Sequence, residues 1–301
     1  MKLAITGATG FVGGHLIDAA IAAGHQVRAL TRRSVRPRVG VDWVEGALDN
    51  EESLAKLVDR TDAIIHVAGV LKGRTEADFD GPNVGGTQSV IDAARSASVQ
   101  RFVHVSSLAA REPKLSLYGA SKARSEHVVA ASGLPHAIVR PPAVYGPGDK
   151  ETLDLFKMAR AGIVMLPPRG RLSLIHVDDL ARLLLALAEP SAPEGLTIEP
   201  DDGRDGGWSH REFAKALGEA VGRRLITVPM PSPLLNGFAR IDEMFRGDRA
   251  KLTRDRAAYF CHPDWVADPR RAAPPHLWRP EIATSEGLAS TFRWYRDNDW
   301  L

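Results

Sequence analysis

The sequence predicts an α/β fold, a doubly wound parallel sheet of the Rossmann type with a smaller, mostly C-terminal lobe. The apolar run from Lys2 to Thr6 is followed by a glycine turn and by helical apolar spacing over Phe11 to Ala23. Strand-like and helical segments then alternate as far as Val139, which is typical of parallel strand pairing. Beyond Pro141 the chain becomes rich in proline and glycine turns, which indicates a second lobe.

The glycine turn after the first strand has the spacing G-x-x-G-x-x-G, and it predicts a dinucleotide site. Gly7 allows a tight turn, Gly10 lets the backbone approach a pyrophosphate, and Gly13 lets helix and strand pack closely. The start of the following helix would face the anion. Ordinary turns also contain glycine triplets, so the strand-to-helix context carries this prediction. We assign these residues of the turn to cofactor binding: Gly7, Thr9, Gly10, Phe11, Val12 and Gly13.

The remaining elements of the sheet follow from short apolar runs between helical segments. The expected strands are Gln26 to Leu30, Val41 to Val44, Ala63 to Val67, Arg101 to Val105 and His136 to Val139. The expected helices are Glu51 to Val58, Val84 to Ala97 and Tyr118 to Ala131. Since Asp178 to Ala188 and Gly195 to Ile198 also look like sheet-domain elements, we expect residues 1–145 and 176–200 to form the nucleotide-binding domain. Residues 146–175 and 201–301 form the expected substrate-binding lobe.

Tyr118 and Lys122 are four residues apart in a predicted helix and form a candidate proton-transfer pair. Residues i and i+4 share a helix face, so the lysine ammonium can lie near the phenol and lower its pKa from about 10. A tyrosine tuned in this way can exchange a proton with a carbonyl or alcohol oxygen. The alternative is a surface tyrosine beside a solvated lysine. Ser107, eleven residues before Tyr118, supplies a nearby alcohol.

Several motifs in order along the chain resemble the extended short-chain dehydrogenases/reductases, the NAD(P)-dependent epimerase/dehydratase group. They are the glycine turn, His66-Val-Ala-Gly69, Asn83-Val-Gly-Gly-Thr87, Val105-Ser-Ser107, Tyr118 with Lys122, Arg140-Pro-Pro-Ala-Val-Tyr-Gly-Pro-Gly148 and His176-Val-Asp-Asp179. The resemblance implies a nicotinamide cofactor and hydride transfer at a carbonyl or secondary alcohol. It covers nearly the whole chain, although Pro231 to Arg256 matches no motif of the group.

The resemblance also implies individual roles. Tyr118 would be the acid/base, Lys122 would also hold the nicotinamide ribose, and Ser107 would bind the substrate oxygen. Ser106 is the competing serine, because adjacent residues of a strand point to opposite faces. The other residues that would contact the cofactor are Leu48, Val67, Ala68, Gly69, Val105, Pro141 and Val144.

The cofactor preference depends on the end of the second strand, Thr31-Arg32-Arg33. Relatives that use NAD place an acid there for the ribose 2′-hydroxyl, whereas arginine binds a 2′-phosphate with a planar fork of donors. Arg32, together with Arg33, therefore favours NADP over NAD. The alternative is a solvated run of charges that continues through Arg36 and Arg38.

Two departures from the group's pattern argue against a sugar nucleotide as the substrate. The interval from Ser107 to Tyr118 is shorter than in the sugar-nucleotide epimerases, and Ala47 stands where the group places an acid near adenine. An oxidoreductase is therefore our first hypothesis. A sugar-nucleotide epimerase or dehydratase with retained cofactor and a non-catalytic dinucleotide-binding regulatory or assembly protein are the alternatives.

The composition limits the possible partners. With 39 basic and 37 acidic residues in 301, no overall charge excess points to nucleic acid or to an anionic membrane. Cys261 is the sole cysteine, which leaves no disulfide and no cysteine cluster for a metal. The expected strand at Lys2 leaves no room for a secretory signal. We expect a cytoplasmic protein with a small-molecule substrate, without a metal or membrane segment, and a homodimer is possible.

Overall fold

Seven parallel strands form the central sheet, in the order β11-β6-β5-β4-β1-β2-β3. The computed structural model describes residues 1–247 and 252–301. The chain first builds outward from β1 through β2 to β3 and then resumes at β4 on the other side of β1, so the switch point lies between β1 and β4. The strands are β1 (Lys2–Thr6), β2 (Gln26–Thr31), β3 (Val41–Glu45), β4 (Ala63–His66), β5 (Arg101–Val105), β6 (His136–Val139) and β11 (Leu196–Ile198). The predicted doubly wound parallel sheet is confirmed.

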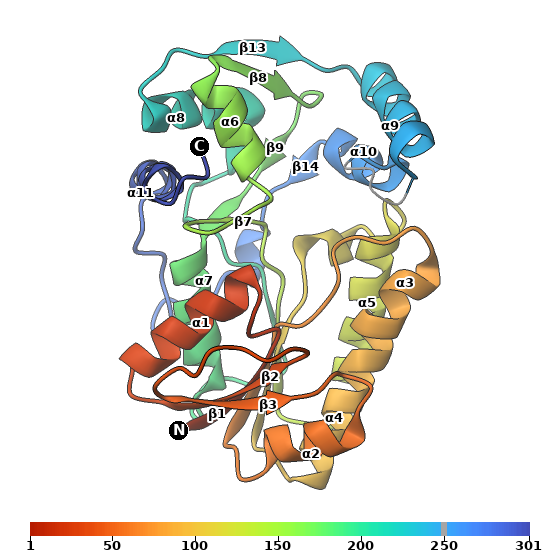
Figure 1. Ribbon diagram of the computed structural model, residues 1–301, viewed down its shortest axis with the longest axis vertical. Helices are drawn as coiled ribbons and strands as arrows, with labels where there is room; N and C mark the ends of the chain where they lie inside the picture. The colour runs from red at the N-terminus through yellow and green to blue at the C-terminus, as the bar shows by residue number, and fades with distance from the viewer. Residues whose placement is uncertain (248–251) are drawn as a thin grey trace. The chain divides into compact units, whose positions relative to one another are not determined.

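Helices cover both faces of this sheet (Figure 1). α1 (Phe11–Ala22) and α7 (Val177–Ala188) lie on one face, where His15 of α1 and Asp178 are joined by a 2.6 Å hydrogen bond. The other face is covered by α2 (Glu51–Val58), α4 (Gly86–Ser96) and α5 (Leu117–Ala130), and the short α3 (Glu76–Asp80) precedes α4. Since both faces are covered, every residue of β4 and β5 is buried.

The apolar run in α7 belongs to the packed interior. Leu180, Leu183, Leu184 and Leu187 are fully buried, which accounts for the run of leucines in this helix. Within residues 1–247 and 252–301, no helix has the length and apolar character needed to cross a membrane.

The chain divides into two compact units, which are described separately. The first comprises Met1–Pro141, Asp178–Pro200 and Arg271–Arg279, and the second comprises Pro142–Val177, Asp201–Arg270 and Pro280–Leu301. The predicted division assigned residues 271–279 to the second lobe. They belong with the first unit because Trp278 donates from Nε1 to the Asp179 carbonyl (3.0 Å) and the Glu199 amide donates to the Arg271 carbonyl (2.9 Å). Residues 142–145 join the second unit because β7 (Ala143–Tyr145) pairs with β10 (Leu174–His176).

The second unit has small sheets around its own core. β8 (Ile163–Leu166) pairs with β13 (Ile226–Pro229), and β9 (Arg171–Leu172) pairs with β12 (Trp208–Ser209) and β14 (Asp264–Trp265). Its helices are α6 (Leu153–Arg160), α8 (His210–Val221), α9 (Ser232–Arg246), α10 (Arg254–Cys261) and α11 (Thr284–Asp297). Tyr145, Phe156, Leu217 and Tyr295 are among the side chains of its core.

One local feature differs from the sequence prediction. The expected helix Val84 to Ala97 starts earlier, as a π-helical turn over Gly81–Gly85 that leads into α4. α2 begins where predicted and is capped by Asn50, which accepts from the Ser53 amide. The π-helical turn has a functional consequence, because it carries Asn83 into the interior.

Gly13 and Gly14 provide a matched test of the turn. A Cβ on Gly13 would lie 2.1 Å from the Gly7 carbonyl oxygen, whereas a Cβ on Gly14 would have no neighbour within 4 Å. We expect Gly13→Ala to lower the free energy of unfolding by about 1–3 kcal/mol or more. Gly14→Ala should raise it by about 0.5–1 kcal/mol. Urea unfolding measures both, and equal stability of the two variants would contradict the close contact between β1 and α1.

Candidate active site

The glycine turn joins β1 to α1 with backbone contacts that exclude side chains. Gly7 has a φ of +69°, and a Cβ there would lie 2.6 Å from the amide nitrogen of Ala68. The ends of β1 and β4 are therefore in direct backbone contact at the switch point of the sheet. Gly10 is exposed and begins α1 without a side-chain cap, so no side chain competes for the amides of the first turn.

These features fit a bound pyrophosphate. Uncapped amides at a helix start attract an anion, and the absence of acidic residues in the first turn of α1 leaves that attraction unopposed. Thr9 is exposed and Phe11 and Val12 are half-buried, whereas Gly13 is buried in the contact with Gly7. Val67 and Ala68 are half-buried and Gly69 is exposed at the end of β4.

Arg32, Arg33 and Leu48, which are also predicted to bind the cofactor, lie just beyond the ends of β2 and β3. Thr31 is buried and donates from its hydroxyl to the Arg33 carbonyl (2.7 Å), and the side chains of Arg32 and Arg33 are exposed. Leu48 packs over Gly86 of α4, where a Cβ would lie 2.7 Å from Leu48 Cδ1. Val144 lies on β7 in the second unit, where it is paired with Ile175.

Ser107 and Tyr118 are brought together by two local caps. Ser116 begins α5 by accepting from the Gly119 amide (2.9 Å), which places Tyr118 in the first turn. Ser107 begins the short 3₁₀ helix Leu108–Arg111 by accepting from the Ala109 amide (3.2 Å). The side chains of Ser107 and Tyr118 are hydrogen-bonded to each other.

Ser106 points to a different partner. Its hydroxyl donates to Glu126 Oε1 at 2.5 Å, and its side chain is buried. The two serines therefore face opposite sides of the strand end, as expected from strand geometry. Ser107 is the serine that faces the candidate proton donor.

The pKa of Tyr118 differs from the sequence-based expectation. Burial raises the pKa of the Tyr118 phenol to about 12, and the hydrogen bond from Ser107 opposes that rise only in part. The expected lowering by Lys122 is wrong, because burial of the phenol has the largest effect on its pKa. Lys122 Nζ donates to the carbonyl of Val105 at 2.8 Å.

Two opposite effects act on the pKa of Lys122, whose ammonium is buried. Burial lowers the pKa of its ammonium to about 8, whereas the negative charge of Glu126, one turn further along α5, acts to raise it. Lys122 Nζ is also close to Gly69, since a Cβ built there would lie 4.0 Å from it. Lys122 thus links α5 to the ends of both β4 and β5.

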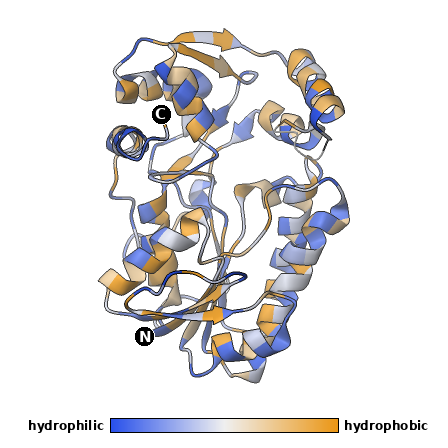
Figure 2. Cartoon of the chain, viewed as in Figure 1, coloured by the Kyte–Doolittle hydropathy of each residue, from blue (hydrophilic) through white to orange (hydrophobic). Residues whose placement is uncertain are grey.

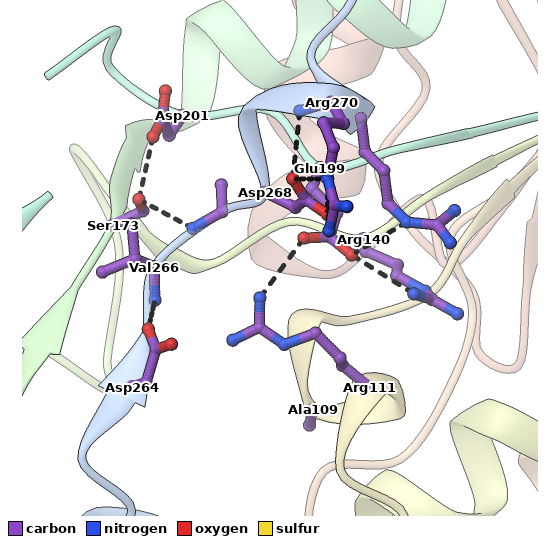
Figure 3. A network of polar contacts seen from close by, with 12 residues as sticks. Ala109, Arg111, Arg140, Ser173, Glu199, Asp201, Asp264, Val266, Asp268 and Arg270 are labelled. Atoms are coloured by element: carbon purple, nitrogen blue, oxygen red, sulfur yellow. Dashed lines mark hydrogen bonds and ion pairs between the residues drawn. The ribbon is translucent and has the colours of Figure 1, made fainter. Parts of the chain in front are cut away.

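An ion network joins the ends of several strands near Ser107, and Figure 3 shows the part of it around Glu199. Arg140 binds Glu126 with two donors, at 2.9 Å from Nε and 2.6 Å from Nη2, and its Nη1 lies 3.2 Å from Glu199. These contacts hold the pKa of Arg140 above its usual value. Figure 3 shows Arg111 pointing toward Glu199 as well, at 3.5 Å.

This network ties together elements that are distant in sequence. Glu126 belongs to α5, Arg140 follows β6, Glu199 follows β11, and Arg111 ends the 3₁₀ helix after Ser107. The Leu108 amide also donates to the Pro141 carbonyl (2.9 Å). Neither Glu126 nor Glu199 was predicted from the sequence. The one indication of Glu126 was its position four residues after Lys122 on the same predicted helix.

Asn83 forms a second support. It is buried and its side-chain oxygen accepts from the Val70 amide (2.8 Å), while its Nδ2 donates to Ser121 Oγ (2.9 Å). It therefore connects the loop after β4 to the residue before Lys122.

The buried histidines are structural. His66 bonds to Thr6 (2.7 Å) and Thr87 (3.0 Å), and His104 bonds to Ser125 (3.0 Å). Burial, followed by the charge of Lys122, lowers the pKa of His66 to about 3 and that of His104 well below its usual value. Both rings are neutral near pH 7. Within the described ranges, no group of three or more potential metal ligands occurs.

The fold is of the dinucleotide-binding type, with the glycine turn at the switch point and with Ser107, Tyr118 and Lys122 near the end of β5. Residues 3–198 match the model of the NAD dependent epimerase/dehydratase family. The chain is 38% identical to the ceramide reductase of Caulobacter vibrioides over 99% of this chain and 96% of that protein. The chain belongs to the NAD-dependent epimerase/dehydratase family.

Other relatives and solved structures agree with this assignment. The chain is 33% identical to a 4-hydroxy-2-methyl-3-oxo-4-farnesyl-3,4-dihydroquinoline-1-oxide ketoreductase of Stigmatella aurantiaca, over 81% of this chain and 80% of that one. Its fold is similar to that of MoeE5 in complex with UDP-glucuronic acid and NAD (TM-score 0.75, 22% identity, 99% of both chains). It is also similar to that of the human epimerase family protein SDR39U1 with NADPH (TM-score 0.73, 20% identity, 99% and 100%). The chain is an NAD(P)-dependent enzyme of the short-chain dehydrogenase/reductase type.

Ser106 and Ser107 supply a matched test of the site. We expect Ser107→Ala to lower kcat by about 10²-fold, because it removes the donor nearest Tyr118. Ser106→Ala should keep kcat within a few-fold and lower the free energy of unfolding by about 1–3 kcal/mol, because it removes a donor to buried Glu126. Steady-state kinetics and urea unfolding separate the two effects, and the opposite pattern would assign the reacting oxygen to Ser106.

Proposed function

We propose that the protein is an NADPH-dependent reductase that reduces a ketone on a ceramide-type lipid. The hydrogen-bonded pair of Ser107 and Tyr118 is the observation that carries the reaction type. The substrate class rests on the 38% identity to a ceramide reductase over nearly the full length of both chains. The ketone is the oxidised counterpart of the secondary alcohol in the long-chain base of a ceramide.

The proposed reaction is a reduction, for which NADPH, when bound at the glycine turn and at Lys122, would supply the hydride. Tyr118 donates its phenolic proton to the carbonyl oxygen, and the C=O double bond becomes a secondary alcohol. Ser107 donates a hydrogen bond to the same oxygen as negative charge develops there. A pKa of about 12 keeps Tyr118 protonated at neutral pH, which is the form that a reduction requires.

The remaining residues of the site hold these two in place. Lys122 would bind the nicotinamide ribose, and Asn83 positions the helix turn before it through Ser121. The second unit would supply the residues that select the substrate. The glycine turn of residues 7–13 would bind the pyrophosphate, and Leu48 would lie beside the adenine.

Sugar-nucleotide epimerase or dehydratase activity with a retained cofactor is the alternative chemistry. The likeness to MoeE5 concerns the fold alone, and the short interval from Ser107 to Tyr118 does not favour a sugar nucleotide. A non-catalytic dinucleotide-binding regulatory or assembly protein would not need Tyr118 and Ser107 to be bonded to each other.

The reaction is tested with purified protein, NADPH and a ceramide-type ketone. We expect NADPH oxidation with formation of the secondary alcohol, and a loss in kcat of about 10²–10⁴-fold in Tyr118→Phe with NADPH affinity retained. Phenylalanine keeps the ring packing and removes only the proton donor. Full turnover by Tyr118→Phe would contradict the assigned acid, whereas turnover of UDP-sugars in place of the lipid ketone would contradict the substrate class.

Cofactor preference is tested at Arg32. It is exposed at the end of β2, where a planar fork of donors can bind a 2′-phosphate. We expect Arg32→Asp to raise the Kd for NADPH by about tenfold or more and to leave the Kd for NADH within a few-fold. Fluorescence titration measures both, with Arg60→Asp as a control for a charge change at an exposed site elsewhere. Tighter binding of NADH than NADPH by the unmodified protein would overturn the preference.

A further inference from the structure

The helix α9 presents an apolar stripe to solvent. Leu234, Phe238, Ile241 and Phe245 follow the i, i+4, i+7, i+11 spacing of one helix face, and all four are exposed, with Phe245 at 78%. Met244 extends the stripe and is 73% exposed. Another side of α9 is packed, since Ala239 is fully buried and Asp242 accepts from the Leu252 amide (2.9 Å). α9 is therefore held in the fold by one face and leaves an apolar face uncovered.

A second apolar surface lies on the strand pair that precedes α9. Ile163 and Met165 of β8 are paired with Ile226 and Val228 of β13, so the four side chains lie on one face. All four are exposed, whereas the alternate residues Val164 and Leu166 are buried in the core of the second unit. Figure 2 shows hydrophobic colouring along β8, β13 and α9. Exposed apolar side chains gathered in this way are typical of an interaction surface.

Exposed basic residues lie on these elements and next to them in the sequence. Residues 161–169 and 222–247, which include β8, β13 and α9, contain five basic residues and two acidic ones. All five basic side chains are exposed: Arg169, Arg223, Arg224, Arg240 and Arg246. The near balance of charge over the whole chain conceals this concentration, which is why composition did not predict a membrane contact.

We propose that this apolar-basic surface docks the protein on an anionic lipid bilayer, with α9 lying in the interface. The apolar face of α9 would enter the boundary between headgroups and acyl chains, and the five arginines would contact lipid phosphates. α9 is short and carries Arg240, Asp242, Glu243 and Arg246, so it lies on the membrane and does not cross it.

Charge complementarity favours a bilayer over a second copy of the chain. In a two-fold symmetric dimer, the same surface would face itself, and five basic residues would meet five. Such like-charge contact disfavours the pairing, whereas an anionic membrane attracts every one of these groups. The inference goes beyond the proposed reaction and does not depend on which carbonyl is reduced.

The test measures binding of the full-length protein to vesicles by sedimentation, without any substrate. We expect binding to vesicles of phosphatidylcholine with phosphatidylglycerol, weak binding to phosphatidylcholine alone, and loss of binding as salt is raised. The double variant Phe238→Glu/Phe245→Glu should bind anionic vesicles about tenfold more weakly or worse. Val39→Glu/Leu71→Glu is the matched control, because both residues are exposed apolar side chains of the first unit, and it should bind normally.

Arg223→Ser/Arg224→Ser tests the charge separately and leaves α9 intact. It should weaken anionic binding, whereas the control Arg60→Ser/Arg95→Ser should not. Far-UV circular dichroism and NADPH affinity report whether each variant is folded. The proposal is overturned if the unmodified protein fails to bind anionic vesicles, or if the α9 and arginine variants bind as well as their controls. A dimer that the α9 variant dissociates, with no vesicle binding, would assign the surface to a second copy and also overturn it.

Discussion

The bonds between Glu126 and Arg140 are the constraint on which the candidate site depends. A buried ion pair is favourable only where its hydrogen-bonding groups are satisfied, and here Glu126 receives two bonds from Arg140 and one from Ser106. Arg140 extends the network to Glu199, which also lies near Arg111. The ends of β5, β6 and β11 are thereby held against α5. Because Ser106 is committed to Glu126, the next residue along the strand is directed toward Tyr118.

Burial has the largest effect on the pKa values of both Tyr118 and Lys122. It raises the pKa of Tyr118 to about 12 and lowers that of Lys122 to about 8, so each group is pushed toward its neutral form. A neutral phenol can donate a proton, which suits reduction of a carbonyl better than oxidation of an alcohol. Glu126 opposes the loss of charge on Lys122, so a single carboxylate supports both the serine strand and the lysine.

Local patterns in the sequence were sufficient to predict the parallel sheet and the turn that joins its first strand to the first helix. The strands Lys2–Thr6, Arg101–Val105 and His136–Val139 begin and end where the apolar runs do. Such local patterns do not predict contacts between residues that are distant in the sequence. Glu199 is 59 residues from Arg140, and Trp278 is 99 residues from Asp179, so neither the ion network nor the place of residues 271–279 could be predicted. The pKa of Tyr118 was predicted in the wrong direction because helical spacing contains no information on burial.

The most direct test is the pKa of Tyr118 in the cofactor-free protein, measured from tyrosinate absorbance during a pH titration. The chain has only four tyrosines, so the difference between the unmodified protein and Tyr118→Phe isolates one phenol. The account predicts no ionisation of Tyr118 up to about pH 10, in keeping with a pKa of about 12. A tyrosinate that forms near neutral pH and disappears in Tyr118→Phe would contradict it.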